Sequence, residues 1–70
     1  MDKKEICILL EQGIIYATNT LRRCQLMLDD FKHHHMPISR IAEHQETMQH
    51  IENYIHRCQQ IINDNSSNDE

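Results

Sequence analysis

The feature that most constrains this chain is a heptad repeat in two long segments, about residues 2–31 and 37–62. In each segment small or apolar residues recur at alternating spacings of three and four, a pattern typical of helices paired in a left-handed supercoil. The first segment places Cys7, Leu10, Ile14, Ala17, Leu21, Cys24, Leu28 and Phe31 at these a and d positions. The second places Ile41, His44, Met48, Ile51, Ile55, Cys58 and Ile62 there, with Ile38 one turn earlier.

The ends of both segments carry helix signals. Asp2 followed by Glu5 fits a capping box, in which each carboxylate satisfies a free backbone N–H. Pro37 suits a first helical turn, where its missing N–H costs little. Between the segments lies a short polar stretch that contains His33-His34-His35. We therefore expect a helical domain over residues 1–62, followed by a disordered polar tail at 63–70.

The two stripes also match each other in register. A short connection forces neighbouring helices to run antiparallel. Folding about the His run brings together the pairs Cys7–Ile62, Leu10–Cys58, Ile14–Ile55, Ala17–Ile51, Leu21–Met48, Cys24–His44, Leu28–Ile41 and Phe31–Ile38. The sequence thus predicts an all-α, antiparallel two-helix hairpin, whose core is this seam.

A hairpin of 70 residues with 39% hydrophobic residues cannot enclose a core by itself. Four apolar residues at b and c positions lie away from the seam and form a patch that a monomer would expose: Ile8, Leu9, Ile15 and Tyr16. Ile6, Met27, Tyr54 and Ile61 lie at g positions and widen the stripe. Exposed patches of this kind mark binding surfaces. Two alternatives remain open for the patch: a docking face for another helical protein, or the core of a homodimeric four-helix bundle.

Charge and cysteine usage limit the partners. Eleven acidic against seven basic residues give a formal charge of −4, which disfavours general nucleic-acid binding. No apolar stretch is long enough for a signal peptide or a membrane span. Three Cys residues without CxxC spacing do not suggest a disulfide framework. We therefore expect a cytoplasmic protein with no membrane partner.

Two groups of residues resemble metal ligands. The side chains of His33-His34-His35 diverge in a loop, so a solvated turn is the simpler interpretation. The Cys24/His44 layer could supply a Cys₂His₂ zinc site only in a symmetric dimer. The simpler interpretation is a polar seam position that sets register or partner choice. We therefore predict no cofactor and no metal.

The sequence offers no sign of an enzyme. Each Cys lies at a heptad position, where burial rather than thiolate activation is expected. There is no phosphate-binding glycine loop, and the single glycine, Gly13, lies within the first helix. That glycine either permits close approach of another helix or weakens its own.

The chain resembles two families of acidic helical hairpins. In length, in the turn ending at Pro37-Ile38 and in the amphipathic segment from Ile41 to Ile62, it is similar to the small co-chaperones of bacterial type III secretion needle proteins. Those co-chaperones bind a tetratricopeptide-like chaperone and help to keep the needle subunit soluble. This resemblance implies a non-enzymatic adaptor that covers an aggregation-prone surface.

The second resemblance is to the Rop-like regulators, which are homodimeric hairpins that bind paired RNA loops. Lys3-Lys4-Glu5, a Cys in the second helix and an acidic tail are similar. The RNA-binding face of Rop is polar and basic, whereas Leu10 and Ile14 belong to the seam here. A homodimeric four-helix-bundle regulator is therefore the alternative function.

Overall fold

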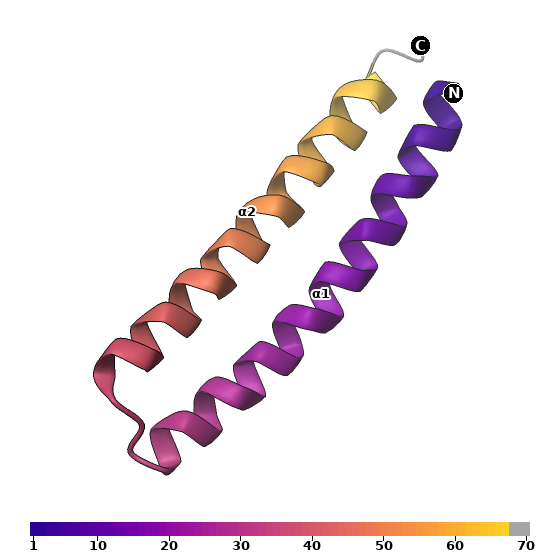
Figure 1. Ribbon diagram of the computed structural model, residues 1–70. Coiled ribbons are helices and arrows are strands. Elements are labelled where there is room, and N and C mark those ends of the chain that lie inside the picture. The colour runs from indigo at the N-terminus through magenta and orange to yellow at the C-terminus, as the bar shows by residue number, and fades with distance from the viewer. Residues whose placement is uncertain (68–70) are drawn as a thin grey trace.

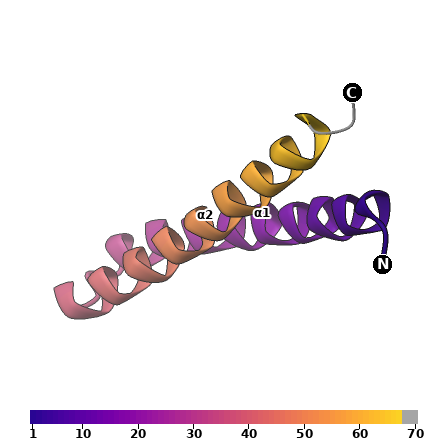
Figure 2. The same cartoon turned by 90° about the horizontal axis from the view of Figure 1, so that it is seen from above.

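The chain forms a hairpin of two long helices in a computed structural model, which describes residues 1–67. Helix α1 spans Lys3–His33 and helix α2 spans Ile38–Ser67. The helices run antiparallel, with the turn at one end and both termini at the other (Figure 1). The hairpin is 53 Å long and 17 by 15 Å across, and Figure 2 shows α2 crossing α1 at an angle. The predicted all-α hairpin is confirmed.

Asp2 caps the start of helix α1, as its half of the predicted capping box requires. Asp2 is the N-cap residue, and its Oδ1 atom accepts a hydrogen bond from the Glu5 backbone N–H at 2.8 Å. The Asp2 carbonyl oxygen accepts the bond from the Ile6 N–H at 3.1 Å. A carboxylate at this point also interacts favourably with the positive end of the helix dipole.

Helix α1 ends in a Schellman motif built without glycine. The Met36 N–H donates to the Phe31 oxygen at 3.0 Å, and the His35 N–H donates to the Lys32 oxygen at 3.2 Å. His35 has a φ of 56°, the left-handed conformation that glycine usually supplies at this position. Met36 and Phe31 line the same hollow, as the apolar contact of this motif requires. The His run therefore forms the turn.

Two details of the predicted hairpin are wrong. Ile38 does not close the seam against Phe31, because it is 85% exposed. The d position one turn before Ile41 belongs to Pro37, so Ile38 lies one position past the seam, and Met36 occupies the space near Phe31. Helix α2 also continues past Ile62 to Ser67, since no Gly or Pro stops its propagation. Residues 68–70 of the expected tail lie outside the described residues.

The core is a seam rather than an enclosed interior. Within residues 1–65, whose burial is described, the buried side chains are Ala17, Leu28, Met48 and Cys58. The other expected seam residues are half-buried: Cys7, Leu10, Ile14, Leu21, Cys24, Phe31, Ile41, Ile51, Ile55 and Ile62. In this part of the chain no large side chain is fully buried. Each seam residue thus contacts one opposing helix and remains partly open at its sides.

Candidate interaction surface

The two sides of the seam differ in chemistry. On one side the e positions are polar apart from Ile38 at the start of α2: Lys4, Glu11, Thr18, Gln25, Lys32, Gln45, Glu52 and Gln59. The g positions on the other side are mostly apolar or small: Ile6, Gly13, Thr20, Met27, Arg40, Thr47, Tyr54 and Ile61. Leu9 and Tyr16, at c positions, extend this second side. We call Leu9, Tyr16, Thr20, Met27, Thr47, Tyr54 and Ile61 the apolar flank.

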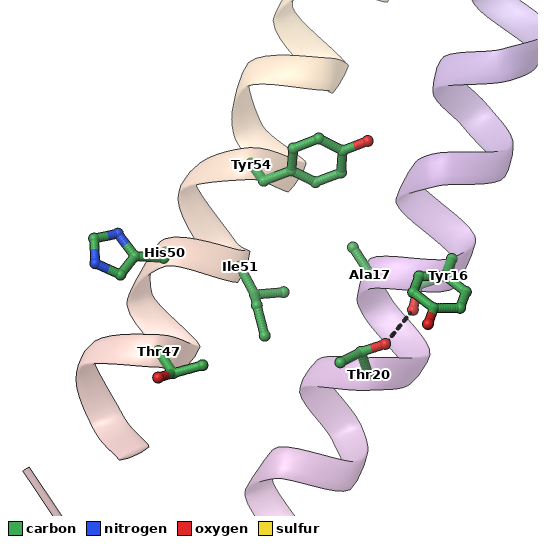
Figure 3. Close-up of a pocket in the computed structure, with 7 residues that line it drawn as sticks. All are labelled: Tyr16, Ala17, Thr20, Thr47, His50, Ile51 and Tyr54. Atoms are coloured by element: carbon green, nitrogen blue, oxygen red, sulfur yellow. Dashed lines mark hydrogen bonds between the residues drawn. The ribbon is translucent and has the colours of Figure 1, made fainter. Parts of the chain in front are cut away.

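A shallow hollow lies at the middle of the apolar flank (Figure 3). It has a volume of about 370 Å³ and is lined by Tyr16, Ala17, Thr20, Thr47, His50, Ile51 and Tyr54. The Tyr54 ring extends from α2 toward α1, whereas the His50 ring points away from α1. Thr20 satisfies its hydroxyl within its own helix by donating to the Tyr16 carbonyl oxygen at 2.9 Å. The hollow is therefore open, mainly apolar and large enough for an aromatic side chain.

Gly13 permits the close approach of Tyr54. A Cβ atom at residue 13 would lie 2.7 Å from the Tyr54 hydroxyl oxygen, closer than such atoms normally come. Of the two predicted roles of this glycine, the structure supports close approach of the other helix. The pKa of the Tyr54 phenol is raised above its usual value. The largest cause is a hydrogen bond with the Cys58 side chain, followed by the charge of that side chain and by burial. Tyr54 is therefore a neutral aromatic group at physiological pH.

Charged residues border the apolar flank toward each end of α2. Glu43 lies toward the turn, in a hollow shared with Phe31, Met36, Arg40, His44 and Thr47. Arg57 lies on the other side of the middle and shares a hollow with Tyr54, His50 and Asn53. Both side chains are exposed. The rim of the flank on α2 thus carries Glu43 beside Arg40 at one end and Arg57 at the other.

The predicted Cys24/His44 layer exists, with different chemistry from a metal site. His44 Nε2 lies 2.7 Å from the main-chain oxygen of Cys24, and this contact requires the tautomer that carries a proton on Nε2. The His44 ring also meets the Phe31 ring edge-on, at a centroid distance of 5.1 Å. Together these contacts make His44 a polar group that is satisfied across the seam.

The His run caps a helix in this structure. His34 Nδ1 lies 2.9 Å from the Asp30 carbonyl oxygen and 3.3 Å from its carboxylate. The rings of His33 and His34 meet edge-on at 5.4 Å. Among the described residues, no three His, Cys, Asp or Glu side chains are placed to hold a metal ion.

The four residues predicted to bind a partner are all exposed, and they divide between two surfaces. Leu9 and Tyr16 belong to the apolar flank, and Tyr16 is 72% exposed beside the hollow. Ile8 and Ile15 lie at b positions, which border the e side of α1. Leu26 is 66% exposed and follows Ile15 by three helical turns on the same side, which the sequence reasoning missed. We call Ile8, Ile15 and Leu26 the outer stripe.

The fold and these surfaces define an all-α helical hairpin that exposes an apolar flank and an outer stripe within the described residues. Neither helix offers a sufficiently apolar stretch for a bilayer span within residues 1–67. Comparisons of the chain with protein-family models, curated proteins and solved structures find no match. The function must therefore be argued from the surface itself.

Proposed function

We propose that this chain is a non-enzymatic, cytoplasmic protein-interaction module that buries its apolar flank against helices of another polypeptide. The observation that carries the proposal is the difference between the two sides of the seam. Leu9, Tyr16, Met27, Tyr54 and Ile61 lie on one side of the seam, whereas the e positions of the opposite side are polar apart from Ile38 at the start of α2. An exposed apolar surface with polar surroundings is typical of a binding site.

The exposed area supports the same proposal. The chain exposes 5634 Å². A compact monomer of 8.4 kDa would expose about 4,600 Å², so the hairpin exposes about 1,000 Å² more. A standard protein–protein interface buries about 800 Å² on each partner. The excess is therefore comparable to one interface.

The resemblance to type III secretion co-chaperones supplies one specific form of the proposal. In that form the hairpin binds a helical chaperone and helps to cover an aggregation-prone subunit until delivery. A partner that wraps around α1 would cover the outer stripe as well as the apolar flank, which accounts for Ile8, Ile15 and Leu26. The second candidate is a homodimeric four-helix-bundle regulator, which is favoured by the arrangement of residues along the flank.

The proposal can be tested by affinity capture with three versions of the tagged full chain. Tyr16→Asp places a charge on the apolar flank, and Thr18→Asp places the same charge on the polar side of α1. Circular dichroism checks that both remain helical, since both positions are exposed. We expect Tyr16→Asp to reduce the captured partner, identified by its mass, at least about tenfold, whereas Thr18→Asp retains it.

Retention of the partner by Tyr16→Asp, or equal loss with Thr18→Asp, would contradict the proposal. Ile15→Asp separates its two forms. A partner that wraps α1 is lost from Ile15→Asp as well, as the co-chaperone form requires. A partner that covers only the apolar flank remains bound to that variant.

A further inference from the structure

We propose that the apolar flank is covered by a second copy of this chain, related by a two-fold axis that crosses the hairpin at the level of the hollow. In this dimer α1 packs antiparallel on α1 of the second copy, and α2 packs antiparallel on α2. The inference rests on the proposed function, because it names the partner of the same surface. Three observations support it: the position of the hollow, the spacing of the apolar residues and the order of the charges.

The hollow lies where such an axis would pass. On α1 its lining residues run from Tyr16 to Thr20, near the middle of Lys3–His33. On α2 they run from Thr47 to Tyr54, near the middle of Ile38–Ser67. Tyr16 is mainly exposed beside the hollow. A two-fold axis at this level places each copy's Tyr16 against the hollow of the other copy, which is the self-complementarity that such an interface requires.

The other apolar residues are spaced evenly about the same level. Leu9 and Met27 lie equally far from residue 18, so an antiparallel α1 pair brings Leu9 of one copy to Met27 of the other. Tyr16 and Thr20 are related in the same way. On α2, Thr47 and Tyr54 lie equally far from the middle of the hollow. Apolar groups therefore meet apolar or small groups on α1 and at the middle of α2, and the same spacing brings Ile61 to Arg40 of the other copy.

The charges on the rim of α2 are complementary about this axis. Glu43 and Arg57 lie seven residues on either side of His50. Within one chain they are about 21 Å apart along the helix axis, too far to form an ion pair. In the antiparallel α2 pair, Glu43 of each copy meets Arg57 of the other. Opposite charges in this order select the antiparallel register and disfavour a shifted one.

The test combines light scattering with charge reversal in the full-length protein. We expect a molar mass near twice 8.4 kDa for the wild type at micromolar concentration. Glu43→Arg and Arg57→Glu should each raise the dimer dissociation constant by about tenfold, the effect of losing modest charge pairs at an interface. The double variant E43R/R57E should recover the wild-type constant to within about threefold.

Mixing the two single variants gives a sharper test. In a two-fold dimer, a Glu43→Arg chain paired with an Arg57→Glu chain restores both rim contacts, so the mixture should dimerise as tightly as the wild type. Glu11→Arg is the matched control, because it makes the same charge change at an exposed e position, on the side of the seam away from the apolar flank. We expect this control to leave the dissociation constant within about twofold of the wild type.

Several outcomes would overturn the inference. The first is a monomeric wild type. The second is a double variant whose dimer dissociation constant is no lower than that of the single variants. The third is rescue of Glu43→Arg by Arg23→Glu, which would place α2 against α1 of the second copy. If the protein is monomeric but captures a different chain in a Tyr16-dependent way, only the identity of the partner is wrong. If Tyr16→Asp changes neither self-association nor capture, the proposed function fails as well.

Discussion

His44 joins the two helices by a hydrogen bond to the backbone of Cys24, with 2.7 Å between Nε2 and the carbonyl oxygen. The same ring packs edge-on against Phe31. His44 is the polar member of an otherwise apolar seam, so this bond fixes the register of α2 along α1. Sliding one helix by a turn would leave the half-buried imidazole without its acceptor.

Replacing His44 should therefore destabilise the hairpin. We expect His44→Ala to lower the free energy of unfolding by about 1–2 kcal/mol, from the lost hydrogen bond and aromatic contact. Urea denaturation followed by circular dichroism, at one fixed protein concentration, measures this change. His56→Ala is the control, because His56 is exposed on the same helix. Equal stability of the two variants would show that the bond to Cys24 contributes nothing.

Replacing His35 with glycine should stabilise the protein. His35 has a φ of 56° at the end of α1, a conformation that costs a side-chain-bearing residue about 1 kcal/mol or more. We expect His35→Gly to raise the free energy of unfolding by about 1 kcal/mol. His33→Gly, at the last residue of α1, should lower it instead, since that backbone is helical. Destabilisation by both variants would contradict the role assigned to residue 35.

Gly13 and Tyr54 should be energetically coupled. Alanine favours a helix by about 1 kcal/mol over glycine, but its Cβ atom at residue 13 would displace the Tyr54 hydroxyl. We expect Gly13→Ala to stabilise the protein less in the wild type than in Tyr54→Phe, where the hydroxyl is absent. A double-mutant cycle of urea midpoints measures the difference. Identical gains in the two backgrounds would mean that the contact is not close in solution.

The ionisation of Tyr54 should depend on Cys58. The chain has two tyrosines, so in Tyr16→Phe the tyrosinate absorbance reports on Tyr54 alone. We expect its pKa to be higher in the folded protein than in urea, and to fall when Cys58→Ala is added. Cys7→Ala is the control and should leave the titration unchanged.

The sign of this shift determines its effect on stability. A raised pKa means that folding favours the neutral phenol, so its contribution is complete below the unfolded pKa of about 10. The contribution is lost as the pH rises above that value. An unchanged pKa of Tyr54 on unfolding would contradict the expectation.

Most of the hairpin follows from local chemistry that the sequence displays. The three-four spacing predicts both helices and their shared seam, and the Asp2 cap forms as expected. The prediction that Cys24 and His44 lie opposite each other in the seam is correct as well. The predicted pair that closes the seam, Phe31–Ile38, is wrong. In the turn His35 adopts a left-handed conformation, which brings Met36 near Phe31 in place of Ile38. Backbone geometry at a turn depends on hydrogen bonds that a heptad pattern does not describe.

The candidate surface was predictable only in part. Ile8, Leu9, Ile15 and Tyr16 are recognisable as apolar residues outside the seam, and all four are exposed. Their division between two surfaces becomes visible only when both helices are placed, because Thr47 and Tyr54 of α2 complete the hollow beside Tyr16. Leu26 was missed because the residues three and four positions away on its helix face are all charged: Arg22, Arg23, Asp29 and Asp30.

The sequence by itself determined the two helices, their antiparallel pairing and the residues of the seam apart from its closing pair, because a 3.5-residue repeat leaves one stripe on each helix to bury. Only the tertiary structure decided which side of that seam is left for a partner. The apolar flank forms only when the g positions of two segments that are distant in sequence lie side by side. How far each residue of one helix is buried depends on the position of the other helix. The apolar flank, its hollow and the charges of Glu43 and Arg57 are properties of that pairing.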